Sequence, residues 1–206
     1  MLTEGVKCAD VDEIFNNVSI VCFNYDRCIE IFLKEALITY YKIDEIKSVD
    51  LVGRLNIIHP YGSVGHFDVR NERFTPLGGE GCSLRKSVAD IRTFNEGLKS
   101  ASHRAAIADA LCDAQTLVFL GFAYHPINMS LLEVDRSSKI QNIFGTAKGM
   151  GEPSIKRVSS DLLRILSKQM FQPDKGGIRN LAAVRQMEIE ENTSHDFLMR
   201  HFRGIT

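Results

Sequence analysis

Four short, strongly apolar runs divide this chain, and they restrict its possible folds more than any other feature. They lie at residues 18–23, 55–58, 116–120 and 139–144, and each is shorter than a typical buried helix. Stretches with helical periodicity separate them. Buried strands that alternate with helices are typical of a mainly parallel sheet covered on both faces. We therefore expect an α/β fold with a doubly wound, Rossmann-like sheet.

Between these runs, apolar residues recur at three- and four-residue steps. The clearest helix follows Asp26, a suitable cap, and should bury one apolar stripe. That stripe contains Ile29, Phe32, Leu33, Ala36 and Leu37. Further helices are expected at 84–94, at 102–112, after Pro126 and from Pro153. We assign residues 1–172 to the α/β domain, and residues 173–206 to a charged tail that is partly helical or flexible.

Composition excludes several classes of protein. The chain is 44% apolar and 25% charged, with a net charge of −1, which is typical of a soluble globular protein. It has no apolar run of membrane-spanning length and no secretion signal, so no membrane partner is expected. Five cysteines without a CxxC pair indicate the reducing cytoplasm rather than a disulfide framework.

Charge and histidine patterns are less informative. Residues 136–185 contain ten basic and three acidic side chains, which we interpret as a solvated helix face. Nucleic acid is therefore a disfavoured partner, although charge alone leaves it open. We expect no metal site, because His195 and His201 have no neighbouring ligands in a zinc-like spacing and should be solvated.

Polar residues and glycines collect just after the apolar runs. In a parallel sheet the carboxyl ends of the strands meet at one edge, where ligands bind. The candidate site residues at this edge are Asn24, Asp26, His59, Tyr61, Gly121, Phe122, Gly145 and Thr146. A structural explanation is also open for the first two, since Asn24 and Asp26 can simply end a strand and cap a helix.

Several of these blocks resemble a known family. VSIVCFNYDRCIE, IIHPYGSVG, TLVFLGFAYHPINMSLL and IFGTAKG are similar to consecutive blocks of the SIR2-like (sirtuin-related) family, in its bacterial branch. The likeness runs from about Asn17 to Lys168. It implies binding of NAD and cleavage of the nicotinamide–ribose bond.

The resemblance also implies roles for individual residues. Asn24 would hold the nicotinamide ribose or an attacking water, and Asp26 would contact the nicotinamide amide. The adenosine half would lie against Gly121, Phe122, Gly145 and Thr146. A histidine directly before a glycine serves the family as the base toward the ribose. The nearest candidate here is His59.

Two departures from the family pattern bear on activity. The family's glycine-rich turn does not precede Val18, so the first nucleotide-binding strand is expected to be missing; whether Met1 is the true start stays open. Tyr61 stands directly before Gly62, where the family has its histidine, and His59 lies about 6–7 Å further back in extended chain. Tyr61 would then be an aromatic wall or a hydrogen-bond donor for the cofactor.

These departures leave two functions open. One is an NAD-binding domain whose complete form acts as an NAD glycohydrolase. The other is a degenerate SIR2-like module that binds or assembles with a partner protein or a second copy without chemistry. The zinc-binding cysteine pairs of classical sirtuins are absent, so deacylation is not expected.

Overall fold

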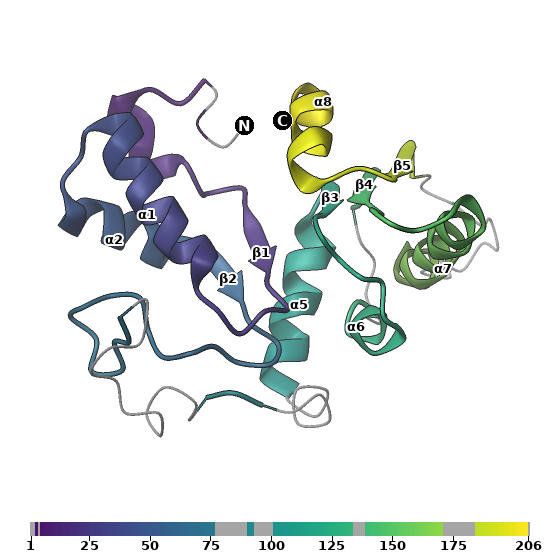
Figure 1. Cartoon of the computed structure of the whole chain (residues 1–206), viewed down its shortest axis with the longest axis horizontal. Coiled ribbons are helices and arrows are strands. Elements are labelled where there is room, and N and C mark those ends of the chain that lie inside the picture. Colours follow the sequence, from purple (N-terminus) through teal and green to yellow (C-terminus); the bar gives the residue numbers. More distant parts are fainter. Residues whose placement is uncertain are drawn as a thin grey trace, which may run out of the picture. The chain divides into compact units, whose positions relative to one another are not determined.

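The computed structural model describes residues 3, 5–76, 90–92, 101–133, 139–170 and 184–205. It divides into an N-terminal unit, residues 2–103, and a C-terminal unit, residues 104–206 together with Met1. Each unit contains short parallel strands and helices, so the chain is a mixed α/β protein (Figure 1). None of the described helices combines the length and apolarity needed to cross a membrane.

The N-terminal unit is built around one parallel strand pair. Its elements are η1 (Cys8–Glu13), β1 (Ser19–Val21), α1 (Cys28–Tyr41), α2 (Glu45–Arg54) and β2 (Asn56–Ile58). In the pair of β1 and β2, Ile20 lies opposite Ile57. The helix pair α1 and α2 connects the two strands, as a parallel pair requires. Residues of η1, α1 and α2, among them Val11, Leu37 and Leu51, form its core.

Side-chain caps explain where the two helices begin. The backbone N–H of Cys28 donates to Asp26 Oδ1 at 3.0 Å, but the N-cap of α1 is Arg27 rather than the predicted Asp26, which lies one residue before the cap. The backbone N–H of Lys47 donates to Asp44 Oδ1 at 2.8 Å at the start of α2. The predicted apolar stripe of α1 is wrong at Phe32, which is 69% exposed, whereas Glu30 is buried.

The C-terminal unit contains a three-stranded parallel sheet. Its elements are α5 (Ala101–Asp113), β3 (Thr116–Phe119), α6 (Pro126–Ser130), β4 (Asn142–Thr146), α7 (Glu152–Met170), β5 (Gln186–Glu190) and α8 (Ser194–Ile205). The strand order is β3-β4-β5, with β4 in the middle. The amphipathic helix α7 buries Val158, Leu162, Ile165 and Leu166, as its periodicity predicted.

The four predicted strands are present, and every pairing between described strands is parallel, but the described strands form two sheets, β1-β2 and β3-β4-β5, where one sheet was expected. Two details differ. Gly145 and Thr146 belong to β4 itself rather than to the turn after it, because β4 stays paired with β5 as far as Glu190. The segment assigned to a tail contributes β5 and α8 to the C-terminal unit. The helix expected at 84–94 lies mostly outside the described residues.

Candidate functional site

The carboxyl ends of β1 and β2 bring Asn24 and His59 together. The imidazole Nδ1 of His59 lies 3.0 Å from the main-chain oxygen of Asn24. The backbone N–H of Cys22 donates to Ile58 O at 2.9 Å, so the parallel pairing continues beyond β1 toward this contact. Asn24 is exposed and uses its main chain here, which leaves its side-chain amide at the surface.

Glu30, in the first turn of α1, holds the other side of the His59 ring. Nε2 of His59 lies 3.0 Å from Glu30 Oε1, and the two side chains are only 11% and 9% exposed. Burial by itself lowers the pKa of His59. Its hydrogen bonds with Cys22, Glu30 and the Asn24 main chain outweigh burial and raise that pKa to about 10.

This electrostatic setting bears on the role assigned to His59. A general base must be neutral and must have a free nitrogen to accept the proton. His59 is instead an imidazolium at neutral pH, and both of its nitrogens are engaged. The geometry therefore suits His59 as a fixed positive charge that joins β1, β2 and α1 better than it suits a base.

Asp26 has the local role that the sequence left open as an alternative. Its hydrogen bond from the Cys28 backbone is the main cause that holds the pKa of the Asp26 carboxyl below its ordinary value. The residue is exposed, so its second oxygen can still meet a ligand. Capping and ligand binding are thus compatible at this position.

Tyr61 is 2% exposed, and its ring packs against aromatic neighbours. The ring centroids of Phe23 and Tyr25 lie 6.0 Å and 6.5 Å from that of Tyr61. Burial raises the pKa of its hydroxyl. Tyr61 therefore contributes mainly to the core beneath the site. The adjacent Gly62 has φ +80°, and a Cβ there would come within 1.7 Å of Asp90 O, so this turn requires glycine.

A cavity of about 550 Å³ lies beside the Glu30–His59 pair, within the N-terminal unit. Residues of α2 and of the loop after β2 complete its lining, including Asp50, Gly53 and His66. Glu30 Oε2 is buried and has no hydrogen-bond partner among the described residues. Glu30 lines the cavity, but this oxygen has almost no accessible surface, so a ligand would reach it only after the Glu30 side chain turned.

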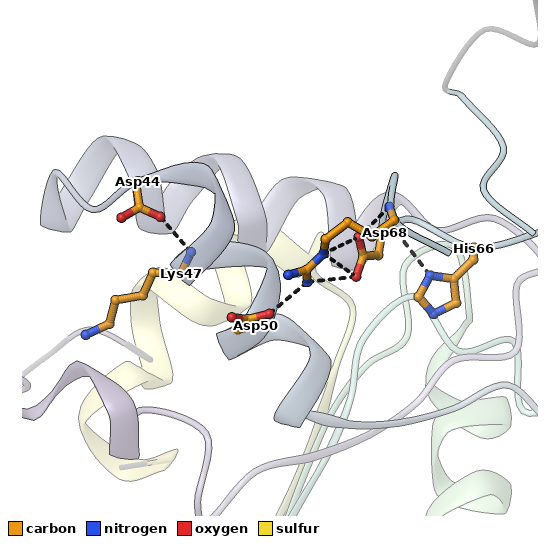
Figure 2. Close-up of polar contacts among 6 residues, drawn as sticks. Asp44, Lys47, Asp50, His66 and Asp68 are labelled. Carbon is orange, nitrogen blue, oxygen red and sulfur yellow. Dashed lines mark hydrogen bonds and ion pairs between the residues drawn. The ribbon is translucent and has the colours of Figure 1, made fainter. Parts of the chain in front are cut away.

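The loop after β2 is anchored by two arginines. The buried Arg27 guanidinium donates to the main-chain oxygens of His66 and Thr75, the latter at 2.6 Å. The Arg70 guanidinium lies 2.7 Å from Asp50 of α2 and 2.8 Å from Asp68 of its own loop (Figure 2). These contacts hold the loop against both helices and so define the cavity.

In the C-terminal unit, the ends of β3 and β4 bring the predicted adenosine-binding residues together. The backbone N–H of Gly121 donates to Thr146 Oγ1 at 2.9 Å, and the Thr146 hydroxyl donates to Phe119 O at 3.4 Å. Gly121 has φ +60°, a conformation that favours glycine. Thr146 therefore ties the turn after β3 to β4.

The glycine at position 145 has a structural cause. A Cβ there would lie 2.5 Å from the Tyr124 hydroxyl and 2.8 Å from Ile189 Cδ1. Tyr124 and Phe122 pack edge to face, with ring centroids 5.3 Å apart. The space that the resemblance reserved for a nucleotide at Gly145 is thus filled by the Tyr124 side chain. Gly121 is exposed, and its surface stays accessible.

Asn24, Asp26, His59 and Tyr61 belong to the N-terminal unit, whereas Gly121, Phe122, Gly145 and Thr146 belong to the C-terminal unit. Each set is brought together at strand ends within its own unit. That the two sets contact one nucleotide stays a prediction.

Sequence reasoning missed three residues. It did not find Arg27, which directly precedes α1, or Glu30, which lies in the first turn of α1. It also expected His201 to be solvated. The His201 side chain is 12% exposed and lies between Glu188 and Glu190. Two like-charged residues alternating with Met187 and Ile189 could have indicated a strand with an acidic face at this point.

Comparison with protein-family models, with curated proteins and with solved structures gives no match to this chain.

Proposed function

We propose that this chain is a SIR2-like domain that binds NAD or a related nucleotide on a doubly wound, mainly parallel Rossmann-like sheet. The observation that carries the proposal is the meeting of Asn24 and His59 at the ends of adjacent parallel strands, beside a cavity that contains Glu30. Ligands of parallel α/β sheets bind beyond such strand ends. The cytoplasm is the proposed compartment, since free cysteines suit it.

The size and chemistry of this region support a small polar ligand. Its volume of about 550 Å³ is within the usual range for ligand pockets, roughly 300–1,000 Å³. Glu30 Oε2 has no partner among the described residues, and a turn of the Glu30 side chain would let it accept from a hydroxyl or an amide N–H. Asn24 does not line the cavity, whereas His59 does, so the exposed Asn24 amide, which can both donate and accept, would meet a part of the ligand outside the cavity.

We expect the domain to bind the nucleotide but to cleave its nicotinamide–ribose bond weakly or not at all. His59 carries a positive charge at neutral pH and cannot accept a proton there, and Tyr61 is buried with a raised pKa. Proton transfer toward the ribose therefore lacks its usual acceptor at these two positions. This favours the second candidate function, a binding or assembly module that holds the nucleotide without cleaving it.

Titration of the full chain with NAD by calorimetry, together with an assay of nicotinamide release, tests both candidates. We expect saturable binding that weakens at least tenfold in Asn24→Ala, with weak or no release of nicotinamide. Asn56→Ala is the matched control, because Asn56 is also exposed but lies at the amino end of β2, where it donates to Ser19 Oγ.

The outcomes separate the alternatives clearly. No NAD binding by the folded chain, or equal binding by Asn24→Ala, would overturn the proposed site. Rapid nicotinamide release that Asn24→Ala abolishes would instead support the full enzyme and refute the argument from the charge of His59.

A further inference from the structure

A second cluster of potential ligands lies in the C-terminal unit, on β5 beside the end of β4. Glu188 and Glu190 lie on β5, and His201 lies on α8. Residues two apart on a strand point to the same side, so both carboxylates face the same helix. One ligand atom from each of the three residues lies within 4.8 Å of those of the other two.

The imidazole of His201 is held between the carboxylates. Its Nδ1 lies 3.2 Å from Glu188 Oε2, and its Nε2 lies 3.3 Å from Glu190 Oε1. The ring stacks on Phe197, with centroids 4.5 Å apart, and Phe144 lies 5.7 Å away. Nε2 is buried and makes no hydrogen bond to any described residue. Stacking thus fixes a ring whose buried Nε2 lies at ion-pair distance from Glu190 without a well-formed hydrogen bond.

Neighbouring donors orient both carboxylates. Gln186 Nε2 donates to Glu188 Oε1 at 2.6 Å. Arg200 Nη1 donates to Glu190 Oε2 at 2.9 Å, and Asn192 Nδ2 donates to the same oxygen. In each glutamate one oxygen is therefore held from outside, while the other is directed at His201. Outer hydrogen bonds of this kind are typical of the carboxylate ligands of metal ions.

We propose that Glu188, Glu190 and His201 bind a divalent transition-metal ion, with zinc as the preferred occupant. One ion can take only one nitrogen of His201, so the glutamate that faces the other nitrogen has to turn toward the ion. One imidazole nitrogen and two carboxylate oxygens then form a three-ligand set that leaves a further position open to water. The imidazole favours zinc over magnesium and calcium, which prefer sites made of oxygen alone. Among the described residues, Arg200 is the one arginine or lysine paired with these two carboxylates, which leaves negative charge for the ion to neutralise.

The same three residues could instead form ion pairs around a protonated His201, and titration with ZnCl₂ decides between the two. Metal-free full-length chain is titrated by calorimetry, and its melting temperature is followed with and without Zn²⁺. We expect one zinc per chain, a higher melting temperature with zinc, and no comparable effect of Mg²⁺. Loss of a residue that hydrogen-bonds a metal ligand costs about 10–100-fold in metal affinity. Removal of a ligand should therefore weaken binding at least tenfold.

Three ligand variants and two controls make the test specific. His201→Gln, Glu188→Gln and Glu190→Gln should each lose zinc binding. His195→Gln, on the same helix, and Glu191→Gln, just after β5, should keep it, because both residues are exposed and outside the cluster. Should His201→Gln fail to fold without the stacked ring, the two glutamate variants decide the matter.

Two results would overturn the proposal. One is the absence of zinc binding by the folded chain. The other is binding that persists in the ligand variants, which would assign the metal to the cysteines or to another site.

Discussion

The buried Glu30–His59 pair makes the stability of the fold depend on pH. A single substitution at Glu30 should remove this dependence. Folding raises the pKa of His59 from the ordinary value of 6.5 to about 10, so the protonated ring favours the folded state. This stabilisation is fully present below pH 6.5 and is lost as the pH rises through about 10. At about 1.36 kcal/mol per unit of pKa shift, the protonated ring stabilises the folded state by at most ~5 kcal/mol.

Glu30→Gln keeps the shape of the side chain but removes its charge. Removing one partner of a buried ion pair typically costs roughly 3–5 kcal/mol. Gln can still accept a hydrogen bond from His59 through its amide oxygen, so we expect a loss of about 3 kcal/mol at pH 6. The difference from the unmodified chain should shrink toward pH 10, because His59 is then becoming neutral in both proteins.

Urea unfolding at pH 6, 7, 8, 9 and 10 measures this difference directly. Glu35→Gln is the matched control, since Glu35 lies on the same helix but its side chain is 60% exposed. That variant should change stability by less than about 0.5 kcal/mol at every pH. A difference between Glu30→Gln and the unmodified chain that stays constant from pH 6 to 10 would refute the coupling between Glu30 and the charge of His59.

Two further substitutions test contacts within the two units, one in each. Gly145→Ala should cost about 1–3 kcal/mol in urea unfolding, because its Cβ would lie 2.5 Å from the Tyr124 hydroxyl. Combining it with Tyr124→Phe should recover part of the loss, and additive losses would contradict this cause. Arg27→Met should speed chymotrypsin cleavage between residues 63 and 76, where Arg27 holds Thr75 O. The exposed Arg54→Met is its control, and equal cleavage of both variants would contradict the anchoring role.

The strands were predictable because their side chains are apolar and short runs of them cannot form a buried helix. Their ends were less predictable, since hydrogen bonds to a distant partner decide them. β4 extends through Thr146 because β5 supplies Glu190 opposite it. β5 itself was assigned to a tail, because Glu188 and Glu190 on one face conceal the alternation with Met187 and Ile189 on the other.

The inner face of α1 was misassigned for a related reason. Apolar spacing placed Phe32 inward and the charged Glu30 outward, but Glu30, Leu37 and Tyr41 share the buried face. Phe32 lies about 200° around the helix from Glu30, on the opposite face. A charged side chain is normally expected outside unless it is paired. Its partner, His59, lies 29 residues away, and no local pattern reveals that contact.

Stability alone is a weak explanation for the Glu30–His59 pair, because well-packed apolar residues often serve as well as a buried ion pair. The pair joins three segments of the chain by directional hydrogen bonds, which apolar residues cannot form. Through Nδ1 and Nε2 one imidazole joins the main chain after β1 to the first turn of α1, while its own backbone ends β2. Directional hydrogen bonds fix the relative position of these segments, which nondirectional packing does less well. Such fixing matters most where a ligand must meet residues from several segments, as the proposed nucleotide would in the cavity lined by α1, α2 and the loop after β2.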